Sequence, residues 1–129
     1  MNRLVSMLQG WNPNKLKAFL MTAGKRAKLQ RNKHIKDIKL IEREVLQFIQ
    51  ENRSERATIK AEQILQHRKL ELAMDIIESI CDLLETRMSY IEQCSSLPAE
   101  LIQPIATLFY ASSRAEVPEL ADVRKQFCA

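Results

Sequence analysis

The sequence predicts an all-α fold, in which a long antiparallel helical hairpin carries two or three shorter helices packed on one end. Only two glycines and four prolines occur in 129 residues, and helix-forming residues such as Leu, Ala, Glu, Lys and Gln are frequent. No segment alternates apolar and polar residues for long enough to indicate a half-buried strand. The length suits one domain, so we expect residues 1–129 to form a single helical domain.

The first predicted helix spans residues 13–51. Asn12 is the expected N-cap and Pro13 the first helical residue, where its missing N–H leaves no partner unsatisfied. Apolar or small residues then recur at steps of three and four, which indicates a helix packed along one seam. The positions of this seam, with Gln30 and His34 in phase, are Leu16, Leu20, Ala23, Ala27, Gln30, His34, Ile38, Ile41, Val45 and Phe48.

The second predicted helix spans residues 52–93 and folds back on the first. Asn52 and Glu55 have the spacing of a capping box, and only an antiparallel return buries both apolar seams. The second half of this helix carries a broad apolar face, wider than one partner helix covers, so further helices must pack there. That face consists of Ala73, Ile76, Ile77, Ile80, Leu83, Leu84 and Met88.

The further helices are expected within residues 97–129, starting near Pro98 and Pro118, with a kink or irregularity at Pro104. The last helix ends without a cap, which suggests that the natural protein is longer. The N-terminal segment, residues 1–12, either frays, docks on the core, or lies on a membrane with Trp11 at the interface.

The charge distribution is strongly uneven. The first 36 residues hold nine Lys or Arg and no acid, whereas the remaining 93 hold eleven bases and sixteen acids. On the first helix the bases lie opposite the seam and suit anionic lipid headgroups, an acidic protein surface or phosphates. The alternative is a solvated helix face. This basic face comprises Lys15, Lys25, Arg26, Lys28, Lys33, Lys36 and Lys39.

An acidic stripe is predicted on the second helix, on the side opposite Ile77 and Leu84. It too has a solvated face as its alternative. If both surfaces are used, the basic face of one copy meets the acidic stripe of another, and such contacts produce open filaments when the rotation closes no ring. The stripe consists of Glu71, Asp75, Glu78, Asp82 and Glu85.

Several classes of protein fit this sequence poorly. No hydrolase, zinc-protease or glycine-rich phosphate motif occurs, so we expect no enzyme, no cofactor and no bound metal. The three cysteines lack C-x-x-C spacing and indicate reduced thiols. No apolar run is long enough to span a bilayer. A basic nucleic-acid-binding module and a coiled-coil adaptor are the remaining alternatives, although the basic region offers no aromatic residue between Phe19 and Phe48 for base stacking.

Two stretches of the second helix carry a family likeness. Residues 52–65, NRSERATIKAEQIL, resemble the start of this helix in the increased-sodium-tolerance (Ist) family of ESCRT-III-related proteins. Residues 70–87, LELAMDIIESICDLLETR, are similar to its continuation, and IATLFYASSR and VPEL are similar to later signatures, although Ser112-Ser113 stands where the family usually has Ala-Pro. The signature positions are Arg56, Ala57, Ile59, Glu62, Ala73, Met74 and Leu84.

The resemblance implies an ESCRT-III-like core that is a non-catalytic assembly and regulatory module. Such modules associate with other ESCRT-III subunits in membrane remodelling, endosomal protein sorting and multivesicular body formation. The implied partners are a CHMP-one/Did-type subunit, whose C-terminal helix docks in a groove of the core, further copies of the chain, and an anionic membrane surface. The resemblance assigns binding of the MIT-domain AAA ATPase to a C-terminal region beyond residue 129, and implies a cytoplasmic protein, peripheral at endosomal membranes.

Overall fold

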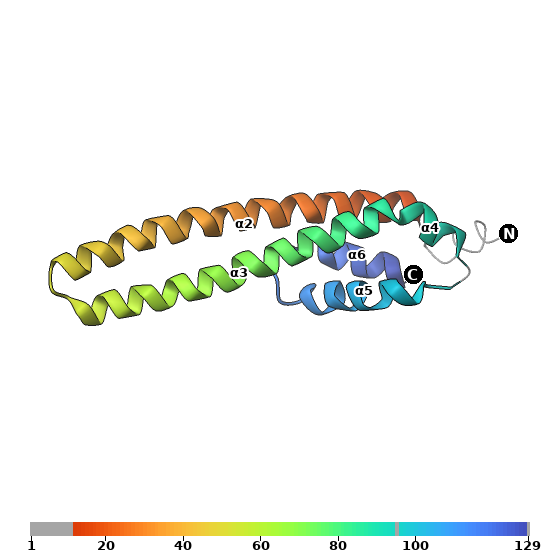
Figure 1. Cartoon of the computed structure of the whole chain (residues 1–129). Helices are drawn as coiled ribbons and strands as arrows, with labels where there is room; N and C mark the ends of the chain where they lie inside the picture. The colour runs from red at the N-terminus through yellow and green to blue at the C-terminus, as the bar shows by residue number, and fades with distance from the viewer. Residues whose placement is uncertain (1–11, 95, 129) are drawn as a thin grey trace. The chain divides into compact units, whose positions relative to one another are not determined.

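The computed structural model describes residues 12–94 and 96–128, and within these ranges it contains helices and no strand (Figure 1). The predicted all-α class is therefore confirmed. The expectations for residues 1–11 lie outside the described residues. The helices are α2 (Pro13–Gln50), α3 (Ser54–Thr86), α4 (Met88–Gln93), α5 (Ala99–Ala111) and α6 (Leu120–Cys128).

The chain divides into two compact units. The hairpin unit is Lys28–Asp75, which holds the second part of α2, the turn and the first part of α3. The bundle unit consists of the described residues of Met1–Ala27 and Ile76–Ala129, so that the first part of α2 and the last part of α3 pack there with α4, α5 and α6.

The start of α2 follows the sequence prediction. The Asn12 side-chain Oδ1 accepts hydrogen bonds from the backbone N–H groups of Asn14 and Lys15, at 3.1 and 3.2 Å. Pro13 is the first helical residue. The backbone N–H of Asn12 also donates to Oε1 of Gln126 at 3.1 Å, which joins the beginning of α2 to α6 within the bundle unit. Asn12 therefore both caps the start of α2 and connects it to α6.

The turn between α2 and α3 differs from the predicted capping box. Asn52 adopts φ 59°, the left-handed conformation, and it ends α2 instead of capping α3. Its N–H donates to the carbonyl of Ile49 at 3.1 Å, and the N–H of Arg53 donates to the carbonyl of Phe48 at 2.8 Å. This pair of bonds is a Schellman motif, in which asparagine tolerates the left-handed position better than most residues. The predicted pairing of Asn52 with Glu55 is therefore wrong.

The predicted second helix is interrupted at Arg87, which separates α3 from α4. Arg87 has φ −93° and ψ 9°, away from helical values, and its Nη1 donates to Oε1 of Glu100 on α5 at 3.0 Å. The bend therefore lies where α5 meets the end of α3. The buried seam still continues across it, because Leu84, Met88 and Ile91 are all buried.

The core of the bundle unit is apolar and closely packed. Small residues let the helices approach each other: a Cβ added to Gly24 of α2 would lie 3.5 Å from the Cβ of Cys81 on α3. Helices α5 and α6 pack through Phe109 and Phe127, whose ring centroids are 6.2 Å apart. Helix α5 continues through Pro104 without ending. The buried residues of this core include Leu16, Leu20, Ile77, Leu84, Leu101, Ile105, Leu108, Val117, Leu120 and Val123.

The predicted broad apolar face of the second helix is covered only in part. Ile77 and Leu84 are buried and Ile80 is half-buried, as expected of core positions. Ile76 and Leu83 are 43% and 36% exposed, so the short helices leave these two positions uncovered. Part of this face is therefore available to a partner.

Candidate functional site

All seven residues of the predicted basic face lie on α2 and are exposed. The helix directs them outward because its seam positions, including Ala23, Ala27 and Ile38, are buried. In the bundle unit, Nε of Arg26 forms a salt bridge with Oε1 of Glu119 at 3.0 Å. Among the described residues, none of the six lysines of the basic face forms a salt bridge.

Within the hairpin unit, two glutamates of α2 form ion pairs with α3 and not with the lysines. Oε1 of Glu42 lies 3.4 Å from Nη2 of Arg68, and Oε2 of Glu44 lies 2.9 Å from Nζ of Lys60. Both partners belong to α3, so these ion pairs connect the two helices and do not neutralise the lysines of α2. The four lysines Lys28, Lys33, Lys36 and Lys39 therefore remain a solvent-exposed cluster of positive charge.

The predicted acidic stripe is less open than the basic face. In the hairpin unit, Oδ1 of Asp75 accepts a hydrogen bond from Nη1 of Arg31 at 2.9 Å, so one carboxylate is paired within the chain. Glu71, Glu78 and Glu85 are half-buried, and Asp82 is exposed. The stripe borders the buried seam of α3 along much of its length, so its side chains are less exposed than those of the basic face.

The family signature positions divide between core and surface. Ala57, Met74 and Leu84 are buried, and Ala73 is half-buried. Their role is to pack the helices. Arg56, Ile59 and Glu62 of α3 are exposed in the hairpin unit, where Ile59 leaves 57% of its surface open.

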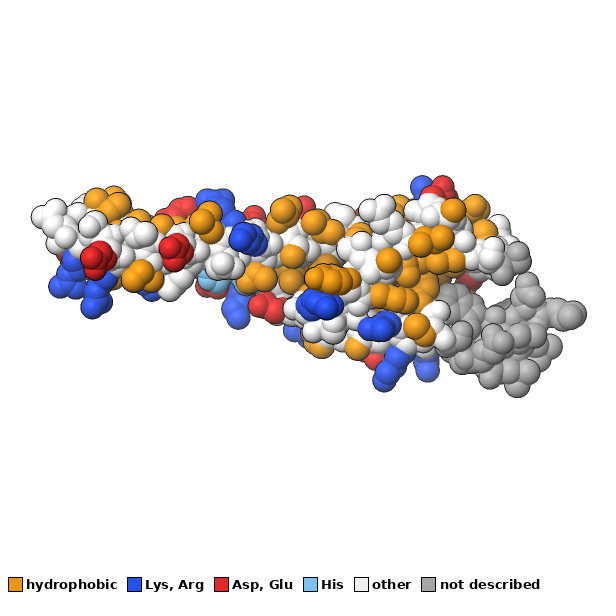
Figure 2. Space-filling view, turned by 90° about the horizontal axis from the view of Figure 1, so that it is seen from below, with side chains coloured by type: hydrophobic (Ala, Val, Ile, Leu, Met, Phe, Trp, Pro, Cys, Tyr) orange, Lys and Arg blue, Asp and Glu red, His pale blue; other side chains and the backbone are white. Residues whose placement is uncertain are grey.

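An exposed apolar surface of the bundle unit was not expected from the sequence, which predicted that short helices would cover it. In Figure 2 hydrophobic side chains gather over the part of the chain that carries α5 and the end of α3. Exposed apolar residues of α3 and α5 in this unit include Ile76, Leu83, Ile102 and Tyr110, with 36–65% of their surfaces open. The sequence did indicate an apolar face on the second helix wider than one partner helix covers. It does not indicate how much of that face the short helices cover.

Cys81, Cys94 and Cys128 are not joined by a disulfide in the part of the chain that the structure describes. Burial raises the pKa of the Cys81 thiol from its ordinary value of 9.0 to about 12, with smaller contributions from the carboxylates of Glu85 and Glu78. This thiol is therefore protonated and unreactive at neutral pH. Cys94 is half-buried and Cys128 is exposed.

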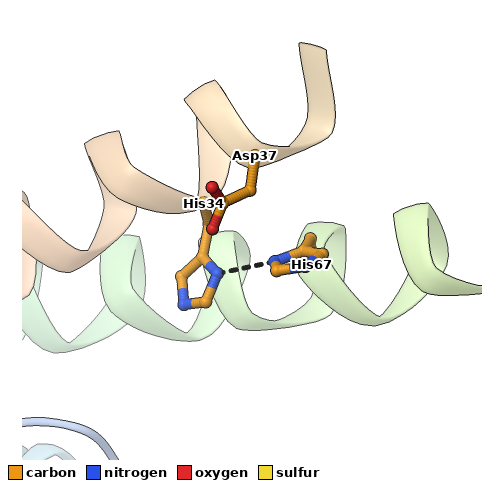
Figure 3. A group of neighbouring side chains, drawn as sticks. All are labelled: His34, Asp37 and His67. Atoms are coloured by element: carbon orange, nitrogen blue, oxygen red, sulfur yellow. Dashed lines mark hydrogen bonds between the residues drawn. The ribbon is translucent and has the colours of Figure 1, made fainter. Parts of the chain in front are cut away.

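The structure brings together two histidines that lie 33 residues apart. Nδ1 of His34 on α2 lies 2.9 Å from Nδ1 of His67 on α3, and Asp37 lies beside them (Figure 3). In the sequence His34 occupies a seam position and His67 lies in a polar stretch that carries no motif. A turn centred on Asn52 does place His34 opposite positions near 70, so the hairpin register was the signal that could have found the pair.

No helix among the described residues is both long enough and apolar enough to cross a membrane.

These helices and segregated charges define an all-helical module with a basic face on α2 and an acidic stripe on α3. The model of the Ist1 family, described as a regulator of Vps4 activity in the MVB pathway, matches residues 17–129, and the chain belongs to that family. An IST1-like protein of Dictyostelium discoideum is 32% identical over 115 residues. That alignment covers 89% of this chain but 31% of the relative, so the chain spans about a third of the relative's length.

Proposed function

We propose that this chain is a non-catalytic assembly and regulatory module of the ESCRT-III pathway, which binds an anionic membrane surface through the basic face of α2. Membership of the Ist1 family supports a regulatory role in multivesicular body formation. In this proposal the chain is cytoplasmic and acts peripherally at endosomal membranes, together with other ESCRT-III subunits.

The observation that carries the membrane contact is the cluster of unpaired lysines in the hairpin unit. Lysines already engaged by neighbouring acids would have to break those pairs before binding an outside anion. Here the nearby glutamates pair across to α3, and the lysines remain available. Each basic side chain close to an anionic bilayer contributes about 1 kcal/mol to binding. Together, four such residues give an attraction that is strong enough to favour binding to the bilayer and weak enough for the chain to dissociate again.

Flotation with vesicles tests this contact. The variant Lys28→Glu/Lys36→Glu reverses two exposed charges of the basic face, and Lys69→Glu/Lys125→Glu reverses two exposed charges outside it, with the same change in net charge. The first variant is expected to lower partitioning onto phosphatidylserine vesicles by at least roughly thirtyfold, and the second to have a much smaller effect.

Binding should also weaken as salt rises and be absent on neutral phosphatidylcholine vesicles. Equal losses in the two double variants would contradict a dedicated basic face. Tight, salt-sensitive binding to RNA with no binding to vesicles would replace the membrane by nucleic acid as the partner.

The proposed protein partner is an ESCRT-III subunit of the CHMP-one/Did type. Its C-terminal helix would use an apolar face, and the exposed residues Ile76 and Leu83, seven positions apart on α3, offer a complementary stripe. The test is the affinity for this subunit of Ile76→Asp compared with Ser79→Asp, a matched change at an exposed position of the same helix. We expect at least a tenfold loss in the first variant and little change in the second.

Self-association is proposed through the basic face and the acidic stripe of a neighbouring copy. Regulation of the MIT-domain ATPase is proposed to need the C-terminal region that the family resemblance places beyond residue 129. The helical module would then contribute assembly and placement at the membrane.

A further inference from the structure

Three potential metal ligands converge in the hairpin unit from both of its helices. His34 is 4% exposed and is the one buried polar residue recorded among the described residues. Asp37 follows it one turn later on α2, and His67 faces them from α3 (Figure 3). One ligand atom from each of the three side chains lies within 4.8 Å of the other two.

A hydrogen bond between the histidines accounts for only part of this arrangement. At 2.9 Å one Nδ1 donates a proton to the other, and the rings are tilted by 50° with centroids 5.1 Å apart. This contact needs two nitrogen atoms and a single proton. It gives no reason for a carboxylate to join the same cluster.

Two imidazole nitrogens and a carboxylate oxygen are a donor set that suits Zn²⁺. Bonds of about 2.0–2.2 Å in a tetrahedral arrangement place the ligand atoms about 3.3–3.6 Å apart, so small side-chain rotations would move these atoms around one ion. Histidine and aspartate three positions apart on a helix already share a face. His67 closes the set from the opposite helix.

We propose that His34, Asp37 and His67 bind a zinc ion that links α2 to α3 in the hairpin unit, with a water molecule as the fourth ligand. This revises the expectation of no bound metal, which rested on cysteine spacing and on sequence motifs. The link also gives a reason for a histidine in the seam. His34 occupies a position between Ala27 and Ile38 where an apolar side chain would otherwise pack, and a metal held there joins the helices directly.

Titration of the full chain with ZnCl₂ by calorimetry tests the site. The protein is prepared without a polyhistidine tag, stripped with a chelator and kept reduced. We expect one zinc ion per chain, and at least about a tenfold loss of affinity in His67→Gln and in Asp37→Asn. Glu42→Gln changes another carboxylate of α2 outside the cluster and should leave the affinity unchanged.

Two further measurements separate this site from binding at the thiols and from unfolding of a variant. The absorption spectrum of bound Co²⁺ should lack thiolate charge-transfer bands. Zinc should raise the midpoint of thermal unfolding of the parent chain but not of His67→Gln. Because His67 is half-buried, the His67→Gln variant should stay helical, which circular dichroism checks. Equal zinc affinity in the parent and in folded His67→Gln, thiolate bands, or no binding by the folded parent would each overturn the proposal and leave the membrane-binding proposal untouched.

Discussion

Arg26 of α2 and Glu119, just before α6, form a salt bridge of 3.0 Å between Nε and Oε1 within the bundle unit. Glu119 belongs to the VPEL stretch that resembles a family signature, and its side chain is only 16% exposed. The other carboxylate oxygen, Oε2, is buried without a hydrogen-bond partner among the described residues. Arg26 is therefore the residue that compensates the charge of Glu119.

A double-mutant cycle measures this contact. The single variants Arg26→Gln and Glu119→Gln and the double variant are expected to give a coupling free energy of about 0.5–1 kcal/mol in urea unfolding, since the Arg26 side chain is 45% exposed and screened. The same cycle with Asp122 in place of Glu119 is the control and should show none. Zero coupling for Arg26 and Glu119 at low salt would show that the pair stabilises nothing.

Asn52 provides a test of the turn between the long helices. Asn52→Gly should keep or slightly raise stability, because glycine adopts a positive φ without steric cost. Asn52→Ala should lower the free energy of unfolding by about 1 kcal/mol. If alanine were as stable as glycine in chemical denaturation, the left-handed conformation at this position would be contradicted.

Leu84 should contribute far more to stability than an exposed leucine on the same helix. Its side chain is completely buried in the bundle unit, so Leu84→Ala is expected to cost about 2–5 kcal/mol. Leu72 is 60% exposed, and Leu72→Ala should change stability by no more than about 0.5 kcal/mol. Similar losses in the two variants by denaturant unfolding would contradict the packing described for α3.

Cys81 predicts a pH dependence at alkaline pH. Its pKa is about 12 in the folded chain and near 9.0 when exposed, so between these values the unfolded chain binds fewer protons. Stability should therefore fall as pH rises from about 9 towards 12, with a contribution of up to about 1.4 kcal/mol per pH unit.

Comparing the parent with Cys81→Ala isolates that contribution from other titrating groups, because the difference in unfolding free energy should shrink as pH rises. Alkylation adds an independent check: the exposed Cys128 should react well before Cys81 in the native chain. A pH-independent difference together with rapid labelling of Cys81 would contradict its burial.

Much of the fold could be predicted from local patterns. The spacing of Leu16, Leu20 and Ala27 predicted the buried seam of α2, and Asn12 with Pro13 predicted where that helix begins. Asn52 was assigned to the wrong helix because asparagine serves both as an N-cap and as a left-handed C-terminal residue, and sequence alone does not choose between them. The break at Arg87 coincides with a contact to Glu100, which is far enough along the chain that local patterns do not indicate it.

The candidate surfaces were predictable to different degrees. The exposed lysines of α2 followed from helical periodicity, because all of them lie away from the seam. The engagement of Asp75 by Arg31 and the meeting of His34 with His67 depend on the register of the hairpin, which periodicity does not give. The exposure of Ile76 and Leu83 on α3 depends on which part of that helix the short helices cover, and local patterns do not indicate this.

The most direct test of the proposed function is negative-stain electron microscopy of this chain mixed with a CHMP-one/Did-type ESCRT-III subunit and phosphatidylserine vesicles. Each component alone, and the Lys28→Glu/Lys36→Glu variant, serve as controls. The account predicts ordered filaments or coated tubules that require both proteins and are lost in the variant. Absence of any polymer or co-sedimentation at low salt, with both proteins folded and the vesicles intact, would contradict it.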